Sequence, residues 1–149
     1  MRELAGIPTF FERRILMSEM KFRGKGIAPE GEATSWHFGK LLTTQDVDGK
    51  SKVFIQEGSD YYLIKTETAG ESTGMVDNYG EDIYEGDLVL IDGNVADVYV
   101  VEWCLFGFML THFDADGSVD TMAALNFFKP ERLTVVDNVI DRKDRLKWQ

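Results

Sequence analysis

Three Asp-Gly pairs constrain the fold of this chain more than any other feature. They are Asp48-Gly49, Asp92-Gly93 and Asp116-Gly117, and each lies next to an apolar run. Asp-Gly favours the tight turn of a β-hairpin, because both residues tolerate the positive φ angles that such turns need. Hairpin signals at this short spacing predict a mainly β protein, a small antiparallel β pseudo-barrel.

The runs between these turns have the β-branched and aromatic content of strands. We expect strands over residues 21–27, 36–44, 53–55, 61–66, 88–91, 95–103, 108–113 and 133–140. Gly39 indicates a bulge or a close approach of two backbones within its strand. The segment 70–74 is polar and contains glycine, so it is predicted to be a loop.

One helix is predicted over residues 121–128. Asp120 can cap its N-terminus, apolar residues recur at every third position, and Pro130 ends it. A short helix in a small β domain is well suited to cap the open end of a barrel.

Residues 1–19 allow two interpretations. Thr9-Phe10-Phe11-Glu12 fits a capping box, which predicts a short amphipathic helix that docks on the barrel or on another subunit. Alternatively, Arg13-Arg14 can be encoded by AGG-AGG, a ribosome-binding sequence, and translation would then start at Met17. Both interpretations stay open.

The segment 77–90 combines turn chemistry, an aromatic anchor and the start of a strand. Gly80 and Gly86 can take positive φ without steric cost, so two turns are expected. Glu85 and Asp87 could form a carboxylate pair for acid–base or metal chemistry. No His or Cys lies nearby in sequence, however, so we interpret Asp87 as a turn residue whose carboxylate accepts backbone N–H groups.

The order of residues in and before this segment resembles the signature of the YopX-like proteins of phages and prophages. The matching motif positions, which we expect to be structural, are Thr73, Gly74, Asp77, Gly80, Ile83, Tyr84, Glu85, Gly86, Asp87 and Val89. Further matches are residues 20–23, Trp36, Phe38, Gly39, Leu41, Leu42, Val101, Trp103, Phe108 and the run 135–140. The resemblance covers about residues 20–141, and it implies a β pseudo-barrel capped by a helix. It departs at Asp137, where glycine is usual, and at residues 142–145.

The chain has 149 residues, of which 44% are hydrophobic, enough for one domain with a single core. We therefore divide it into an N-terminal extension over residues 1–19, a YopX-like β-barrel domain over 20–141, and a charged C-terminal tail over 142–149.

The charge of the chain restricts its partners. Its 26 acidic residues outnumber 16 basic ones, which gives a net charge of −10. A surface of this sign repels phosphate backbones, so direct nucleic-acid binding is not expected. An acidic protein can instead mimic nucleic acid or dock on a basic partner.

Cysteine usage and hydropathy indicate the compartment. Cys104 is the single cysteine, so no intrachain disulfide can form and a reducing environment is the simplest inference. No apolar run approaches ~20 residues, and Arg13-Arg14 interrupts the N-terminal apolar residues. We therefore expect no membrane partner and, with the phage resemblance, a cytoplasmic location in a bacterial host cell.

Several residue groups could carry chemistry. Residues 46–49 and 114–117 open like calcium loops, but they lack the later ligands and are better interpreted as hairpin turns. Cys104 and His112 could act as nucleophile and base, yet Cys104 lies in an apolar strand, where cysteine is usually a small core residue. Two histidines and one cysteine are too few for a closed zinc site without carboxylates. No metal, cofactor or catalytic residue is predicted.

An enzymatic function is disfavoured but stays open. Phosphate-loop, dinucleotide, nucleophile-elbow and zinc-protease motifs are all missing from the sequence. An enzyme would require Glu81, Asp82, Glu85 and Asp87 to face one concave pocket.

Adjacent aromatic residues favour self-association. In a strand, Tyr61-Tyr62 must place one ring outward, and Phe127-Phe128 is a second such pair. The sequence therefore predicts a non-enzymatic interaction module that binds a protein partner or itself as a homo-oligomer. The alternative is an acidic DNA mimic or regulator that binds a host nucleic-acid-processing protein. No small-molecule ligand can be named.

Overall fold

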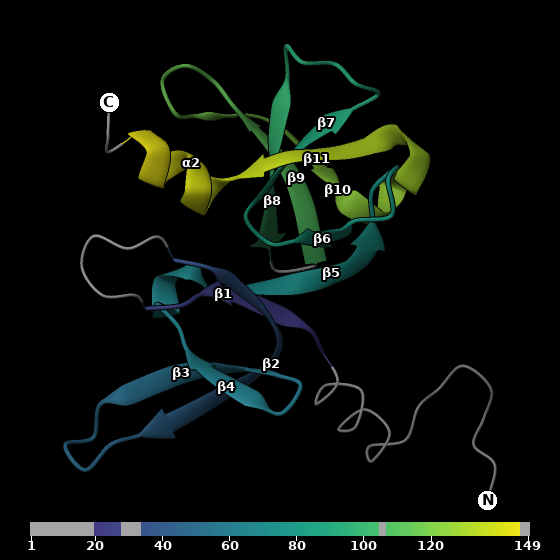
Figure 1. Ribbon diagram of the computed structural model, residues 1–149. Helices are drawn as coiled ribbons and strands as arrows, with labels where there is room; N and C mark the ends of the chain where they lie inside the picture. The colour runs from purple at the N-terminus through teal and green to yellow at the C-terminus, as the bar shows by residue number, and fades with distance from the viewer. Residues whose placement is uncertain (1–19, 28–33, 105–106, 147–149) are drawn as a thin grey trace, which may run out of the picture. The chain divides into compact units, whose positions relative to one another are not determined.

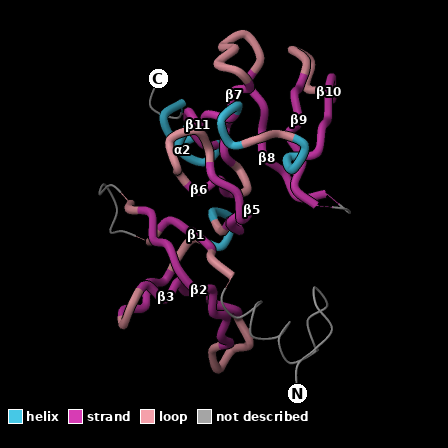
Figure 2. Tube along the Cα trace, turned by 90° about the vertical axis from the view of Figure 1, so that its right-hand side faces the viewer, coloured by secondary structure: helices cyan, strands magenta, loops and turns pink. Residues whose placement is uncertain are grey.

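The computed structural model describes residues 20–27, 34–104 and 107–146, and in them the chain is mainly antiparallel β-structure (Figures 1 and 2). The predicted fold class is confirmed in its β content and its antiparallel pairing, and the described residues include one short α-helix, which lies near the C-terminus rather than where it was predicted. The predicted N-terminal helix and the alternative start at Met17 lie outside the described residues. The chain forms two compact units, Met1–Glu71 (unit 1) and Ser72–Gln149 (unit 2).

Unit 1 is an antiparallel sheet. Its strands are β1 (Phe22–Lys25), β2 (Trp36–Gln45), β3 (Ser51–Glu57), β4 (Asp60–Leu63) and the first residues of β5 (Gly70–Val76), in the order β4-β3-β2-β1-β5. Strands β1–β4 form a meander, and β5 pairs with β1. A 3₁₀ turn, Thr66–Thr68, precedes β5. Val53, Ile55 and Ile64 form its buried cluster, against which Phe22, Leu41 and Ala69 pack.

Gly39 is a site of close backbone approach in unit 1, as predicted. A Cβ atom at this position would lie 2.0 Å from the carbonyl oxygen of Gln56 on the neighbouring strand. No side chain fits at that separation, because the obstacle is backbone rather than a movable side chain.

Unit 2 is built on a second sheet. Its strands are β7 (Asp87–Ile91), β8 (Val98–Cys104), β9 (Gly107–Phe113), β10 (Val119–Ala124) and β11 (Leu133–Asn138), in the order β10-β9-β8-β7-β11. Strand β6 (Asp82–Tyr84) pairs with the later part of β5, 3₁₀ turns cover Leu125–Phe127 and Pro130–Arg132, and helix α2 (Val139–Leu146) follows β11. Its fully buried cluster is Ile83, Val89, Val101, Leu110, Leu125 and Leu133.

The sheets do not close into the predicted pseudo-barrel in the described part of the chain. In unit 2, β10 pairs with β9 and β11 pairs with β7, but β10 and β11 do not pair with each other. Closure requires pairing of the first and last strands, so the sheet keeps two edges.

The predicted helix over residues 121–128 is wrong. Its first half is strand β10, with Met122 opposite Thr111 of β9, and the remainder is the turn Leu125–Phe127. The Asp116-Gly117 turn folds this segment back along β9, so hairpin pairing overrides a weak helical pattern. Leu125 still enters the core of unit 2.

Other boundaries also differ from the sequence predictions. The strand predicted over residues 61–66 ends at Leu63, and Thr66 begins a 3₁₀ turn. Residues 70–74, predicted as a loop, belong to strand β5. The last strand ends at Asn138 rather than 140, because Asn138 caps helix α2: its Oδ1 accepts the Asp141 N–H at 2.8 Å, and its Nδ2 donates to the Asp141 carboxylate at 2.9 Å.

The Asp-Gly pairs do form turns. Gly49 and Gly117 have φ angles of 81° and 88°, and each closes a hairpin loop through its N–H. Asp92 and Gly93 both have positive φ, 52° and 68°, as a type I′ turn requires. Strand β8 resumes only at Val98, so this third connection is a longer loop than predicted.

Candidate functional site

One part of the family-like motif is an Asp-x-x-Gly corner, a tight turn that occurs in both units. In an Asp-x-x-Gly run the glycine N–H donates to the aspartate carbonyl, at 3.0 Å for Gly49 to Asp46 in unit 1 and 3.0 Å for Gly80 to Asp77 in unit 2. In both corners the aspartate Oδ1 also accepts two backbone N–H groups from the following residues. Residues 114–118 repeat the backbone pattern.

Asp77 is the buried version of this corner. Its side chain is almost fully enclosed, at 3% exposure, and its Oδ2 accepts a third N–H, from Val135 of β11, at 3.0 Å. Three backbone donors stabilise the carboxylate charge in place of water. Asp77 therefore holds the corner against β11.

The second corner of the motif surrounds Gly86. The buried Asp87 accepts the Tyr84 N–H through Oδ2 at 2.7 Å, which is the turn role that its sequence context predicted. Gly86, with φ of 90°, donates to the Val101 carbonyl and accepts from the Val139 N–H. This corner consequently connects β7, β8 and the start of α2.

The remaining motif residues also occupy structural positions. The Thr73 hydroxyl donates to the Ile83 carbonyl at 2.8 Å and accepts the Met75 N–H at 3.1 Å. Gly74 has φ of 79°, within the irregular part of β5. Ile83 and Val89 are fully buried in the core of unit 2.

The four carboxylates proposed for an enzyme site differ in their surroundings. Glu81 and Asp82 are exposed, Glu85 is half-buried and Asp87 is buried. In the described ranges, no group of three or more His, Cys, Asp or Glu side chains has an arrangement that could hold a metal ion.

Cys104 and His112 lie at opposite ends of strand β9's hairpin with β8. Cys104 pairs with Gly107, and His112 is five residues further along β9, about 16 Å away at about 3.3 Å per residue. They cannot act as a nucleophile–base pair in this arrangement.

His112 instead lies between two aspartates, a grouping that sequence reasoning missed. Its Nδ1 is 3.1 Å from the Asp120 Oδ2, and its Nε2 is 3.5 Å from the Asp97 Oδ1. His112 and Asp120 lie at equal distances in sequence from Asp116, so a hairpin turning there would have predicted their contact. Asp97 lies in the β7–β8 loop, which that hairpin does not include. These contacts tie the β7–β8 loop to β9 and β10.

A second charged contact braces the same loop. Both guanidinium contacts of Arg132 reach the Asp92 carboxylate, Nε to Oδ1 at 2.9 Å and Nη2 to Oδ2 at 2.7 Å. The hydrogen bonds lower the pKa of Asp92 and raise the pKa of Arg132. Both groups are exposed, so solvent screens the pair.

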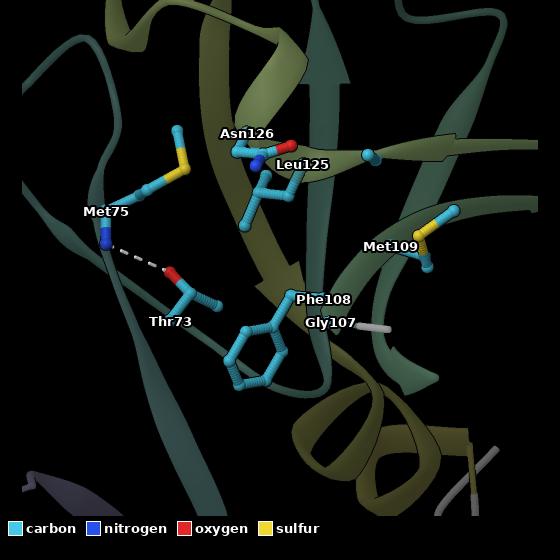
Figure 3. Close-up of a pocket in the computed structure, with 8 residues that line it drawn as sticks. Thr73, Met75, Gly107, Phe108, Met109, Leu125 and Asn126 are labelled. Carbon is cyan, nitrogen blue, oxygen red and sulfur yellow. Dashed lines mark hydrogen bonds between the residues drawn. The ribbon is translucent and has the colours of Figure 1, made fainter. Parts of the chain in front are cut away.

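Unit 2 contains a pocket of about 430 Å³ (Figure 3). Its lining comes from β5, from the start of β9, from the end of β10 and from the 3₁₀ turn that follows it: Thr73, Met75, Gly107, Phe108, Met109, Ala124, Leu125 and Asn126. Figure 3 shows Met75, Phe108 and Leu125 placed around the cavity. None of the lining side chains titrates near neutral pH, so the pocket suits an apolar group better than acid–base chemistry.

Strand β10 forms an edge of the sheet beside this pocket. In the part of the chain that the structure describes, it pairs with β9 alone. Val119 lies opposite Phe113 and Met122 opposite Thr111, on the face away from the core. Val119 is 53% exposed, Met122 46% and Phe113 37%. We call Phe113, Val119 and Met122 the β10 patch.

The outward rings that the aromatic pairs predicted are present. Tyr61 is 60% exposed while Tyr62 stacks on His37 with ring centroids 3.8 Å apart. Phe127 is 81% exposed, whereas Phe128 packs against the core of unit 2.

Fold and corners together define a small antiparallel β protein with hydrogen-bonded Asp-x-x-Gly turns. The family model described as YopX protein matches residues 27–146, and the chain belongs to that family. This agrees with the resemblance seen in the motif of residues 73–89. A search of curated proteins found no match. Among the described residues, no helix is both long and apolar enough to cross a membrane.

Proposed function

We propose that this chain is a phage-encoded, non-enzymatic protein-interaction module that self-associates through the β10 edge of unit 2. The observation that supports the proposal is an edge strand whose exposed side chains include the apolar β10 patch. An edge strand presents backbone N–H and C=O groups to any segment that can pair with it.

Pairing of β10 with the same strand of a second copy would be isologous. Two antiparallel β10 strands related by a two-fold axis bring together two identical patches of Phe113, Val119 and Met122. Burying these side chains supplies the hydrophobic term that backbone pairing alone lacks. The adjoining pocket can receive an apolar side chain from the partner, because the pocket lies at the end of β10.

The mass of the protein in solution tests this proposal. Light scattering over low to high micromolar concentrations should show a rise from 16.9 kDa toward twice that mass. Val119→Lys should shift the equilibrium to monomer, since a paired charge at this position would have to be desolvated.

Val47→Lys is the matched control. Val47 is fully exposed in the β2–β3 turn of unit 1, so the same change of side chain should leave the mass unchanged. A strict monomer at every concentration, or equal effects of the two variants, would refute self-association through β10.

A second candidate function is an acidic DNA mimic, and the distribution of charge favours it. Residues 72–149 contain 15 acidic and 6 basic residues, a net charge of −9. Asp97 and Asp120 flank His112 at the loop end of the sheet, and Asp114 and Asp116 lie in the loop between β9 and β10. A basic nucleic-acid-binding protein is the partner this charge suits.

Capture from a bacterial lysate tests the second candidate. The captured protein should elute when DNA is added, and a variant with Asn at Asp114, Asp116 and Asp120 should capture less. Elution by salt but not by competing DNA would argue for ordinary ion exchange and against mimicry.

A further inference from the structure

Unit 1 presents one sheet face that combines cations with aromatic rings. Val53 and Ile55 point into the buried cluster, so the alternate residues of the same strands lie on the opposite face. We call this the outer face of unit 1, and its aromatic side chains are Trp36, Phe38, Phe54 and Tyr61.

Basic side chains are interleaved with these rings. The buried Arg23 guanidinium lies 4.7 Å from the centroid of the Trp36 ring, and the half-buried Lys25 has its ammonium 5.7 Å from it. Lys40 and Lys52 continue the outer face along β2 and β3, and both are exposed. The strand register therefore places cations and rings on one face of the sheet.

Carboxylates of strands β1–β4 lie on the other face. Glu57 and Asp60 lie opposite each other in the β3–β4 register. Because side chains alternate along a strand, both lie on the face opposite to that of Gln56 and Tyr61. Unit 1 as a whole has 10 basic and 11 acidic residues, a net charge of −1. The repulsion expected from a net charge of −10 is therefore concentrated in unit 2.

We propose that the outer face of unit 1 binds single-stranded nucleic acid. Bases can stack on Phe38 and Tyr61, and the phosphates can pair with the exposed Lys40 and Lys52. Single strands suit this surface because duplexes keep their bases stacked on one another. An acidic peptide would use the lysines but would leave the rings without a matching partner.

Fluorescence anisotropy with labelled oligo-dT and oligo-rU tests the proposal on the full chain. We expect binding that weakens with salt, with a log–log slope of about −0.7 for each phosphate contacted. Tyr61→Ala should weaken binding about tenfold, the loss of one stacked base. Lys40→Ala should reduce the salt slope by about 0.7.

Matched variants separate this face from general charge or aromatic effects. Tyr79→Ala removes a similarly exposed tyrosine from unit 2, and Lys50→Ala removes a lysine from the β2–β3 turn; neither should change the affinity. Circular dichroism verifies folding of every variant.

Three outcomes would overturn the proposal. They are no binding to either oligonucleotide at the highest soluble concentration, equal losses for the Tyr61 and Tyr79 variants, and complete competition by polyglutamate with no effect of Tyr61→Ala. The last result would identify the face as a site for acidic proteins. Loss of self-association in Val119→Lys has no bearing on this test, so the two proposals fail separately.

Discussion

The two units of this protein use the same turn chemistry to build different surfaces. Both contain an Asp-x-x-Gly corner, yet unit 1 is nearly neutral and unit 2 has a net charge of −9. Unit 1 places Arg23, Lys25, Lys40 and Lys52 on a face with aromatic rings, whereas unit 2 has carboxylates in its loops and an apolar edge at β10. Net charge for the whole chain conceals both features, because it averages a nearly neutral unit with a strongly acidic one.

The buried clusters of the two units also differ in size. Unit 2 buries a cluster of six apolar residues almost completely, and unit 1 buries three. Composition predicted a single core, but apolar residues in the described ranges form two clusters. A smaller cluster removes less apolar area from water, so unit 1 is expected to be the less stable part.

The largest expected effect is in the core of unit 2. Leu110→Ala should lower the unfolding free energy by about 3 kcal/mol, through lost burial and the cavity left behind. Urea titrations of single-tryptophan variants can report the units separately, with Trp36 in unit 1 and Trp103 in unit 2. The transition at Trp103 should move and that at Trp36 should stay. Equal shifts of the urea midpoint at both tryptophans would contradict the division into two units.

Next in size is a comparison of the two corners. Asp77→Asn should cost about 2 kcal/mol, because a buried carboxylate that accepts three backbone N–H groups is replaced by a neutral amide. Asp46→Asn makes the same change in the more exposed corner of unit 1 and should cost about 1 kcal/mol or less. Chemical denaturation measures both. Equal costs would show that burial of Asp77 adds nothing to its role.

The smallest expected effect concerns the loop pair Asp92 and Arg132. The pKa of Asp92 is lowered below 3.8 in the folded protein, so its contribution to stability is present above that pH. It is lost as the pH falls through the folded pKa. The melting temperature of Asp92→Asn should therefore be slightly below that of the parent near neutral pH. The difference between the two melting temperatures should disappear in acid. A difference that widens on acidification would contradict the ion pair.

Local residue chemistry predicted a large part of this structure. The Asp-Gly turns, the strands between them and the turn role of Asp87 follow from interactions within a few residues, which the chain order makes visible. The same holds for the Asn138 cap of α2, whose Asn-x-x-Asp spacing is a readable signal that the strand prediction over residues 133–140 overlooked.

The rest depended on contacts between segments distant in sequence. The segment 119–124 became a strand because β9 was available to pair with it, and His112 met Asp97 only because two hairpin loops lie at one end of the sheet. Which side chains of β1–β4 share a face with the cations likewise required the strand register, and the boundary at which the charge divides required the two units. Turn and strand preferences act over a few residues, whereas faces, edges and open sheets arise from pairing across the whole chain.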